Sequence, residues 1–154
     1  MKPKHAHDLT PEQKRASLQY LMFLEKKRDG LIKVRGCTDG RKKRETTNKY
    51  DASTPTVAIE SVMISCTINA KEGRYVATVD IPGAFIQDDM DETVHVQMEG
   101  TVAELLIKMN PKLYQKYVCN KRGKTVLYMD LLKALYGTLR AALLFWKLLL
   151  KKAD

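Results

Sequence analysis

The chain has 154 residues, of which 44% are hydrophobic and 29% are charged, and its formal net charge is +9. This length predicts a single domain, and the apolar content is enough for a hydrophobic core, which excludes a chain that is disordered throughout. The excess of Lys and Arg favours a polyanionic partner such as nucleic acid, because cations that bind phosphates release counterions. The alternative is a solvated basic surface.

The spacing of cysteines and histidines argues against several kinds of site. The three cysteines form no C-x-x-C pair, which argues against a disulfide framework and against a zinc site. His5, His7 and His95 also lack the spacing of a metal motif, so we interpret them as non-ligands. No signal peptide is expected, and the longest apolar run, residues 141–146, is far shorter than the roughly 20 residues of a spanning helix. We therefore expect no membrane partner.

Residues 1–9 are polar, and we expect them to form a loose leader before one domain over residues 10–154. A helix is predicted to begin directly after this leader. Thr10 suits the N-cap, Pro11 suits the first helical position, and Gln13 can complete a capping box.

The apolar residues within 18–24 continue a helical face, so the predicted helix runs on to Arg28 and ends at an Asp-Gly turn. Residues 31–36 then alternate between apolar and basic side chains, which predicts a strand. On that strand Lys33 and Arg35 share one face.

The middle of the chain mixes turns with two longer elements. Residues 38–44 contain an Asp-Gly turn followed by four consecutive cations, and a loop is expected over residues 48–56. Over residues 56–73 the length favours a helix, although the β-branched content would suit a strand. Residues 74–81 alternate in the manner of a strand.

The C-terminal half predicts two more strands and two more helices. The strands are residues 93–98 and 124–129, and the helices are residues 101–109, with a capping box at its start, and 139–152. Strands and helices do not alternate regularly, so the predicted class is α+β, with an antiparallel sheet and packed helices.

One carboxylate stands out in this pattern. Asp80 lies at the C-terminal end of the strand predicted over residues 74–81, just before Pro82-Gly83. Pro82 removes a backbone donor and Gly83 permits left-handed geometry, so the chain is expected to leave the sheet and expose Asp80 at its edge. The alternative is an aspartate that caps the following turn.

Four blocks of sequence carry a family likeness. In chain order they are "GLIKVRGCTDGRKKR", "YVATVDIPGAF", "DMDETVHVQMEG" and "LLKALYGTLRAALLFW". They resemble the reverse transcriptase of copia-type long-terminal-repeat retrotransposons. In that family a finger strand reads K-A-R-L-V-x-x-G, then come V-D-V-x-x-A-F, an acidic hairpin with V-Y-M, and L-x-K-A-L-Y-G-L-x-Q-A-P. The resemblance covers about residues 18–150 and implies the fingers and partial palm of an RNA-directed DNA polymerase.

The resemblance implies roles for individual residues around the incoming nucleotide. Asp80 matches the first metal-binding carboxylate for Mg²⁺, and the Ile81 carbonyl could join it in two-metal nucleotidyl transfer. Lys33 and Arg35 match the cations that hold a deoxynucleoside triphosphate, the alternative being a solvated strand face. Phe85 matches the aromatic under the sugar, the alternative being a core residue.

The resemblance also implies contacts with the template-primer. Tyr136 and Gly137 match a segment that packs against template and nascent base pair, the alternative being a turn before the last helix. Four cations would touch template phosphates without reading sequence, the alternative being a plain charged loop; they are Arg41, Lys42, Lys43 and Arg44.

Two departures from the family pattern shape the functional expectation. Arg140 stands where the family has Gln, and the family's Pro is missing. The Y-x-D-D hairpin, which carries the other two metal ligands of the family, is not among these residues. Asp88, Asp89 and Asp91 lie in a polar connection, and we interpret them as structural turn residues. We therefore expect a truncated polymerase domain that is inactive alone.

Two alternatives remain open beside this expectation. One is a non-catalytic, basic, nucleic-acid-binding remnant. The other is a basic interaction domain of unrelated fold, which would bury Asp80 in a turn and have no cleft.

Overall fold

The computed structural model describes residues 1–44, 54 and 56–153, and within them the protein has an α+β fold. A six-stranded sheet has the order β1-β6-β4-β2-β3, and β5 pairs with β6 outside this path. The strands are β1 (Lys2–Lys4), β2 (Leu18–Lys26), β3 (Ile32–Thr38), β4 (His95–Glu99), β5 (Cys119–Lys121) and β6 (Lys124–Asp130). The predicted antiparallel sheet is in fact mixed, because β2 and β4 pair in parallel, Leu18 with Val96 and Gln19 with Gln97.

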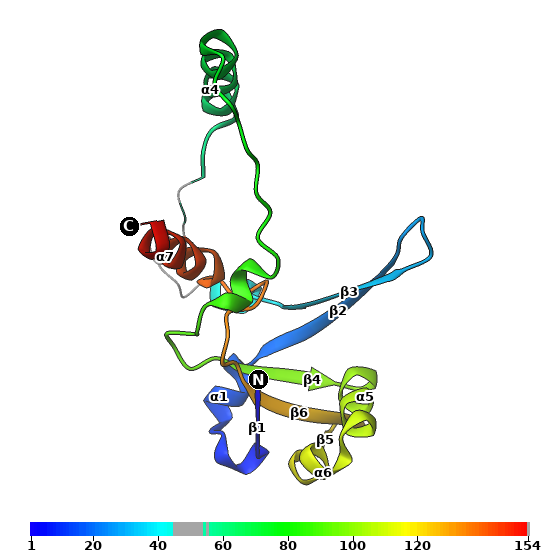
Figure 1. The fold of residues 1–154 in the computed structure, drawn as a ribbon. Coiled ribbons are helices and arrows are strands. Elements are labelled where there is room, and N and C mark those ends of the chain that lie inside the picture. Colours follow the sequence, from blue (N-terminus) through cyan, green and yellow to red (C-terminus); the bar gives the residue numbers. More distant parts are fainter. Residues whose placement is uncertain (45–53, 55, 154) are drawn as a thin grey trace.

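Helices pack on this sheet and extend beyond it (Figure 1). They are α1 (Pro11–Ala16), α2 (Arg41–Arg44), α4 (Ile59–Glu72), α5 (Thr101–Met109), α6 (Pro111–Tyr114) and α7 (Ala141–Ala153), with short 3-10 turns η1 (Ala6–Asp8), η2 (Ala84–Gln87) and η3 (Gln115–Tyr117). The helices expected over residues 56–73, 101–109 and 139–152 are confirmed. The capping box at Thr101 is wrong: the N-cap is Gly100, and no side chain caps that helix. None of the helices in the described part has the length and apolar character of a membrane span.

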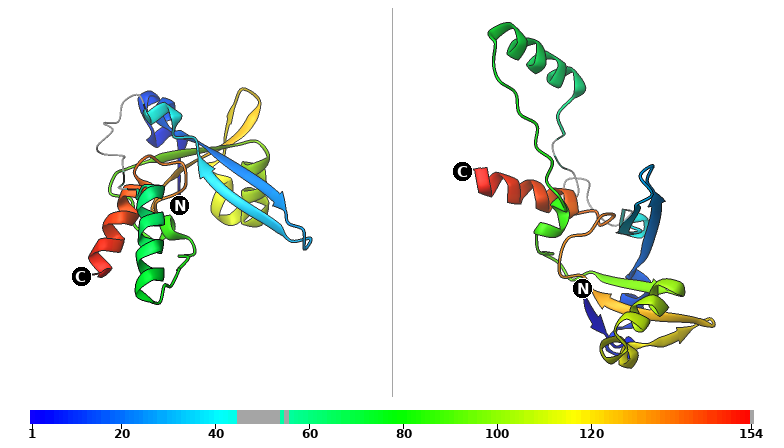
Figure 2. Two further views of the ribbon diagram at one scale, coloured as in Figure 1. Left: turned by 90° about the horizontal axis from the view of Figure 1, so that it is seen from above. Right: turned by 45° about the vertical axis from the view of Figure 1, so that its right-hand side comes forward.

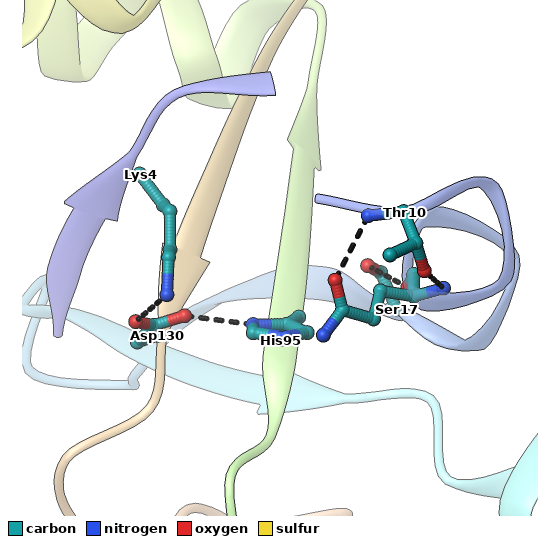
Figure 3. Close-up of polar contacts among 6 residues, drawn as sticks. Lys4, Thr10, Ser17, His95 and Asp130 are labelled. Carbon is teal, nitrogen blue, oxygen red and sulfur yellow. Dashed lines mark hydrogen bonds and ion pairs between the residues drawn. The ribbon is translucent and has the colours of Figure 1, made fainter. Parts of the chain in front are cut away.

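The first nine residues are part of the fold, so the expectation of a loose leader is wrong. Strand β1 pairs antiparallel with β6, and Leu9 is buried. Figure 3 shows Asp130 held between two side chains: Lys4 Nζ lies 3.2 Å from one carboxylate oxygen and His95 Nδ1 lies 2.7 Å from the other. This pairing depends on a carboxylate at the far end of the chain, so the local polar pattern of the leader could not reveal it.

The predicted start of the first helix is confirmed, but its predicted length is wrong. The Thr10 hydroxyl accepts from the Gln13 N–H, and the Gln13 side chain accepts from the Thr10 N–H. The helix ends at Ala16, and residues 18–26 form strand β2 instead. Strand β2 pairs with β3 along seven residues, so long-range backbone pairing outweighs the helical spacing of its apolar side chains.

The Asp-Gly turn closes a hairpin rather than ending a helix. The Asp29 carboxylate accepts a hydrogen bond from the Leu31 N–H at 3.0 Å, and Gly30 has a φ of +84°. Such a turn needs a residue that tolerates positive φ, which glycine does. Strand β4 pairs with β2 only at Leu18 and Gln19, so the rest of the hairpin β2–β3 projects from the sheet (Figure 2).

The core lies on both faces of the sheet. Alternate residues of β6 point to opposite sides: Leu127 and Met129 pack with Ala103 of α5, whereas Val126 and Tyr128 pack with Leu9. The base of β2 packs through a separate cluster of Leu18, Val94, Val96 and Leu131. This alternation is the expected period of a strand covered on both faces.

Residues 59–81, which we call the arm, stand apart from the sheet (Figure 1). Helix α4 has no buried residue. The strand predicted over residues 74–81 is not formed: these residues pair with no described strand, and Tyr75, Val76 and Val79 are exposed. A strand is stabilised only when another strand satisfies its backbone groups, so the alternating pattern alone leaves an extended segment.

Candidate functional site

A cleft of about 820 Å³ lies between the hairpin β2–β3, the end of the arm and the segment before α7. It is lined by five of the residues singled out from the sequence: Lys33, Arg35, Asp80, Ile81 and Tyr136. These residues come from three distant parts of the chain. The fold therefore brings the predicted cations, the predicted carboxylate and one predicted aromatic to one place.

The hairpin wall supplies positive charge. Lys33 and Arg35 alternate with Val34 on β3, so both cations point to the same side of the strand. Arg35 Nη1 lies 3.9 Å from Glu25 Oε2, and both side chains are 62% exposed, so this ion pair is weak. Lys33 forms no ion pair within the described residues. The two cations are thus available to an anionic ligand.

Asp80 is the only carboxylate among the described residues that line the cleft. It is exposed, and within the described part it accepts no hydrogen bond, so the alternative of a turn-capping aspartate gains no support. The turn is instead built by Pro82 and Gly83, which has a φ of +61° and precedes η2. Asp80 was predicted at the end of a sheet strand, which is wrong; it lies in the extended segment of the arm.

Phe85 packs behind the cleft, and its position matches the alternative of a core residue. Its ring centroid lies 4.5 Å from that of Tyr136 and 6.1 Å from that of Phe145. It also contacts the buried cluster of Ala134, Ala141 and Leu144. Phe85 does not line the described cleft but supports Tyr136, which does.

Gly137 anchors the segment before α7 to the hairpin. The Thr38 N–H donates to the Tyr136 carbonyl at 2.8 Å. Gly137 has a φ of +88°, and a Cβ on it would lie 1.8 Å from the Thr38 carbonyl oxygen. No side chain fits at this position. Gly137 therefore positions Tyr136 and is not itself among the residues that line the cleft.

The four consecutive cations lie on α2, outside the lining of the described cleft. Arg41 donates to Asp39, with Nη2 2.7 Å from a carboxylate oxygen, and this hydrogen bond raises the pKa of Arg41. Lys43 Nζ lies 3.0 Å from Glu92. The side chains of Lys42 and Arg44 lie outside the described part of the chain. Acidic neighbours thus partly neutralise both of the described cations.

The polar connection over residues 87–92 is held in place by ion pairs. Asp89 pairs with Lys133 and Asp91 pairs with Arg140, each at 2.7 Å. Asp89 and Asp91 therefore contact neighbouring cations, which agrees with a structural role through ion pairs; their interpretation as turn residues stays a prediction. The pairs also give Arg140, the departure from the family pattern, a role that sequence analysis missed: it ties the connection to the start of α7. No cluster of three or more metal-ligating side chains occurs within the described residues.

Several residues that line the cleft were not assigned to the site from the sequence, and two of them are Cys37 and Phe23. Cys37 follows Lys33 and Arg35 at the same alternation, so the strand pattern could have indicated it. Burial raises the pKa of its thiol, and the charge of Asp39 adds to this shift. Phe23 faces the cleft from β2, directly across from Arg35. It was missed because residues 18–28 were predicted to be helical.

Comparisons with protein-family models, with curated proteins and with solved structures found no match to this chain. Two cations, one carboxylate and apolar or aromatic side chains such as Phe23 and Tyr136 surround the cleft. This lining suits a ligand that carries both phosphate and a flat ring.

Proposed function

We propose that the chain forms the fingers and part of the palm of an RNA-directed DNA polymerase of the copia-type retrotransposon class. In this proposal the cleft receives a deoxynucleoside triphosphate beside a template-primer. The single observation that carries it is that Lys33, Arg35 and Asp80 line one cleft. The sequence resemblance implies these three residues for one site, although they lie in separate segments of the chain.

Lys33 and Arg35 would bind the phosphates of the triphosphate. Arg binds phosphate oxygens through two parallel N–H donors, and Lys binds them as a compact charge. The weak pair with Glu25 leaves Arg35 free to reorient toward a stronger anion. The aromatic rings of Phe23 and Tyr136 offer surfaces on which a base or sugar can pack.

Asp80 and the Ile81 carbonyl are the groups that would hold Mg²⁺. Magnesium commonly uses one or two carboxylates together with substrate phosphates, and the exposed Asp80 beside two phosphate-binding cations fits such a shared site. The ion would supply charge neutralisation of the phosphates and activation of the primer hydroxyl. The family's other two carboxylates belong to the Y-x-D-D block, so we propose that these 154 residues alone do not catalyse polymerisation.

A second candidate function is a non-catalytic, basic remnant that binds nucleic acid. The net charge of +9 favours it, and so does the presence of a single carboxylate among the described residues of the cleft. Such a protein would use Lys33 and Arg35 on backbone phosphates and would need neither Asp80 nor a metal. The third hypothesis, of an unrelated basic domain, expects a buried Asp80 and no cleft, whereas Asp80 is exposed and lines one.

Triphosphate binding tests the proposal directly. Calorimetry with a deoxynucleoside triphosphate and Mg²⁺ should show roughly tenfold or greater weakening in the Lys33→Gln/Arg35→Gln variant. The control Lys108→Gln/Lys112→Gln removes the same charge from α5 and α6 and should bind as the wild type does. Asp80→Asn should weaken binding only when Mg²⁺ is present. Equal affinity in all variants would reject the cleft as the binding site.

Primer extension and salt titration separate the candidate functions. Incorporation by the wild type that is lost in Asp80→Asn would show an active enzyme, contrary to our proposal of inactivity alone. Template-primer binding whose logarithm falls with the logarithm of salt concentration is expected of both candidates. A slope near zero in this plot would reject both candidate functions.

A further inference from the structure

A second, separate cavity of about 420 Å³ lies between α1, β5 and β6. Lys14 and Arg15 reach it from α1, and Lys121 reaches it from β5. Tyr128 and Cys119 complete its inner side. In Figure 1, α1 and β5 lie at the end of the molecule away from α4, and no residue of this cavity also lines the cleft.

The charges around this cavity are unbalanced. No described residue of its lining carries a carboxylate, and within the described part none of the three cations forms an ion pair. A carboxylate nearby is that of Glu99, which accepts from the Gln97 amide. Burial raises the pKa of Tyr128, and the charge of Glu99 adds to this shift. Lys121 Nζ has only a long contact of 3.4 Å to the Gln97 side-chain oxygen. Three cations in the lining of one cavity attract an anion.

Two neutral side chains at the inner side fit an anion as well. Tyr128 is 3% exposed, and its hydroxyl forms no hydrogen bond within the described residues. The hydroxyl is not among the fully buried polar atoms, so the exposed tip of Tyr128 faces the cavity and can donate to an oxygen of a ligand there. Burial raises the pKa of the Cys119 thiol, while Lys14 and Lys121 act in the opposite direction. The charges of both lysines therefore act on the Cys119 thiol, which lies at the inner side of the cavity.

We propose that this cavity is a binding site for a phosphate group, held by Lys14, Arg15 and Lys121. The size of the cavity is within the usual range for small-ligand sites. The phosphate could belong to a free phosphorylated compound or to a nucleic-acid backbone, since both present the same tetrahedral anion. This site does not depend on the polymerase proposal, because it shares no residue with the cleft.

Protection of Cys119 from alkylation tests the proposal in the unmodified chain. Iodoacetamide labelling followed by peptide mass spectrometry gives the rate at each cysteine. Pyrophosphate, with ionic strength held constant by NaCl, should slow labelling of Cys119 by about tenfold when bound at saturation. Cys66, which is exposed on α4, is the internal control and should react at an unchanged rate. A single-stranded oligonucleotide forms a second arm: protection by it alone assigns the phosphate to nucleic acid.

Variants decide whether the three cations are responsible. Protection should require at least about tenfold more ligand in Lys14→Gln/Arg15→Gln/Lys121→Gln, and the single variants Lys14→Gln and Lys121→Gln should show smaller losses. The control Lys108→Gln/Lys112→Gln/Lys152→Gln removes equal charge elsewhere and should keep protection. The cleft variant Lys33→Gln/Arg35→Gln should also keep it, so a failure of the proposed function would not affect this result. The proposal is overturned if neither ligand protects Cys119, or if protection persists in the triple variant.

Discussion

The sheet and the arm contain similar residues in very different surroundings. Val96 of β4 is 0% exposed and lies in register with Met129 of β6. Val79 of the arm is 84% exposed and has no described strand beside it. Both are β-branched residues in alternating segments, so their intrinsic preference is the same. The difference shows that residues with a high β-propensity form a strand only when a neighbouring strand pairs with them and one face of the strand is packed.

The helices of the two regions show the same contrast. Helix α5 buries Ala103 and packs on Met98, Leu127 and Met129 of the sheet. Helix α4 is longer, yet it buries none of its residues, and Met63 and Ile64 are exposed. Most helical stability in proteins comes from packing of an apolar face, so α5 is anchored by the core and α4 depends on its own turns.

This contrast matters for the cleft, because its two sides come from the two regions. Lys33 and Arg35 belong to a hairpin that is continuous with the sheet, whereas Asp80 belongs to the arm. The distance between the cations and the carboxylate therefore depends on the contacts between the arm and the rest of the protein. Among the described contacts that hold this end of the arm are the turn at Gly83 and the packing of Phe85 against Tyr136 and Phe145.

The largest effect should come from two glycines that share a positive φ but differ in surroundings. Gly137→Ala should lower the free energy of unfolding by roughly 4 kcal/mol, because left-handed strain adds to a forced shift of the Thr38 backbone. Gly73→Ala, where a Cβ would meet nothing within 4 Å, should lower the free energy of unfolding by at most about 1 kcal/mol, because no neighbouring atom has to move. Urea denaturation measures both. Equal losses would show that the two surroundings are equivalent.

A smaller effect is expected from a matched pair of valines. Val96→Ala should lower the free energy of unfolding by roughly 2 kcal/mol, since it removes fully buried methyl groups and leaves a cavity. Val79→Ala should change it by less than about 0.5 kcal/mol, because the side chain is already in water. The same denaturation measurement applies. A large loss at Val79 would mean that the arm is packed against something in solution.

Local signals predicted the elements whose causes are local. The Thr10 cap, the alternation of residues 32–36 and the helices at 59–72 and 101–109 follow from neighbouring residues. The apolar spacing of residues 18–24 fits a helix as well as a strand. Pairing with β3 decides between them, and this pairing cannot be read from the spacing of apolar residues within one segment.

The site was partly predictable for the same reason. Alternation placed Lys33 and Arg35 on one face, and the family resemblance connected them with Asp80. The ion pair of Arg140 with Asp91 and the docking of Gly137 on Thr38 join distant segments. No pattern within one segment could show them. Phe23 was missed because a helix was predicted where strand β2 forms. In a helix its side chain would not have been placed on the same face as Arg35.

The smallest expected effect comes from a substitution on the hairpin wall of the cleft that should change ligand binding but not stability. Glu25→Gln should change the free energy of unfolding by less than about 0.5 kcal/mol, because its pair with Arg35 is long and exposed. The same change should strengthen deoxynucleoside triphosphate binding by roughly two- to threefold, since it removes a negative charge beside Arg35 and leaves both cations to the ligand. Glu104→Gln on α5 is the matched control, because it removes one exposed carboxylate far from the cleft, and calorimetry measures both variants. If Glu104→Gln strengthened binding equally, net charge alone would explain the gain, and the hairpin wall would lose its specific role.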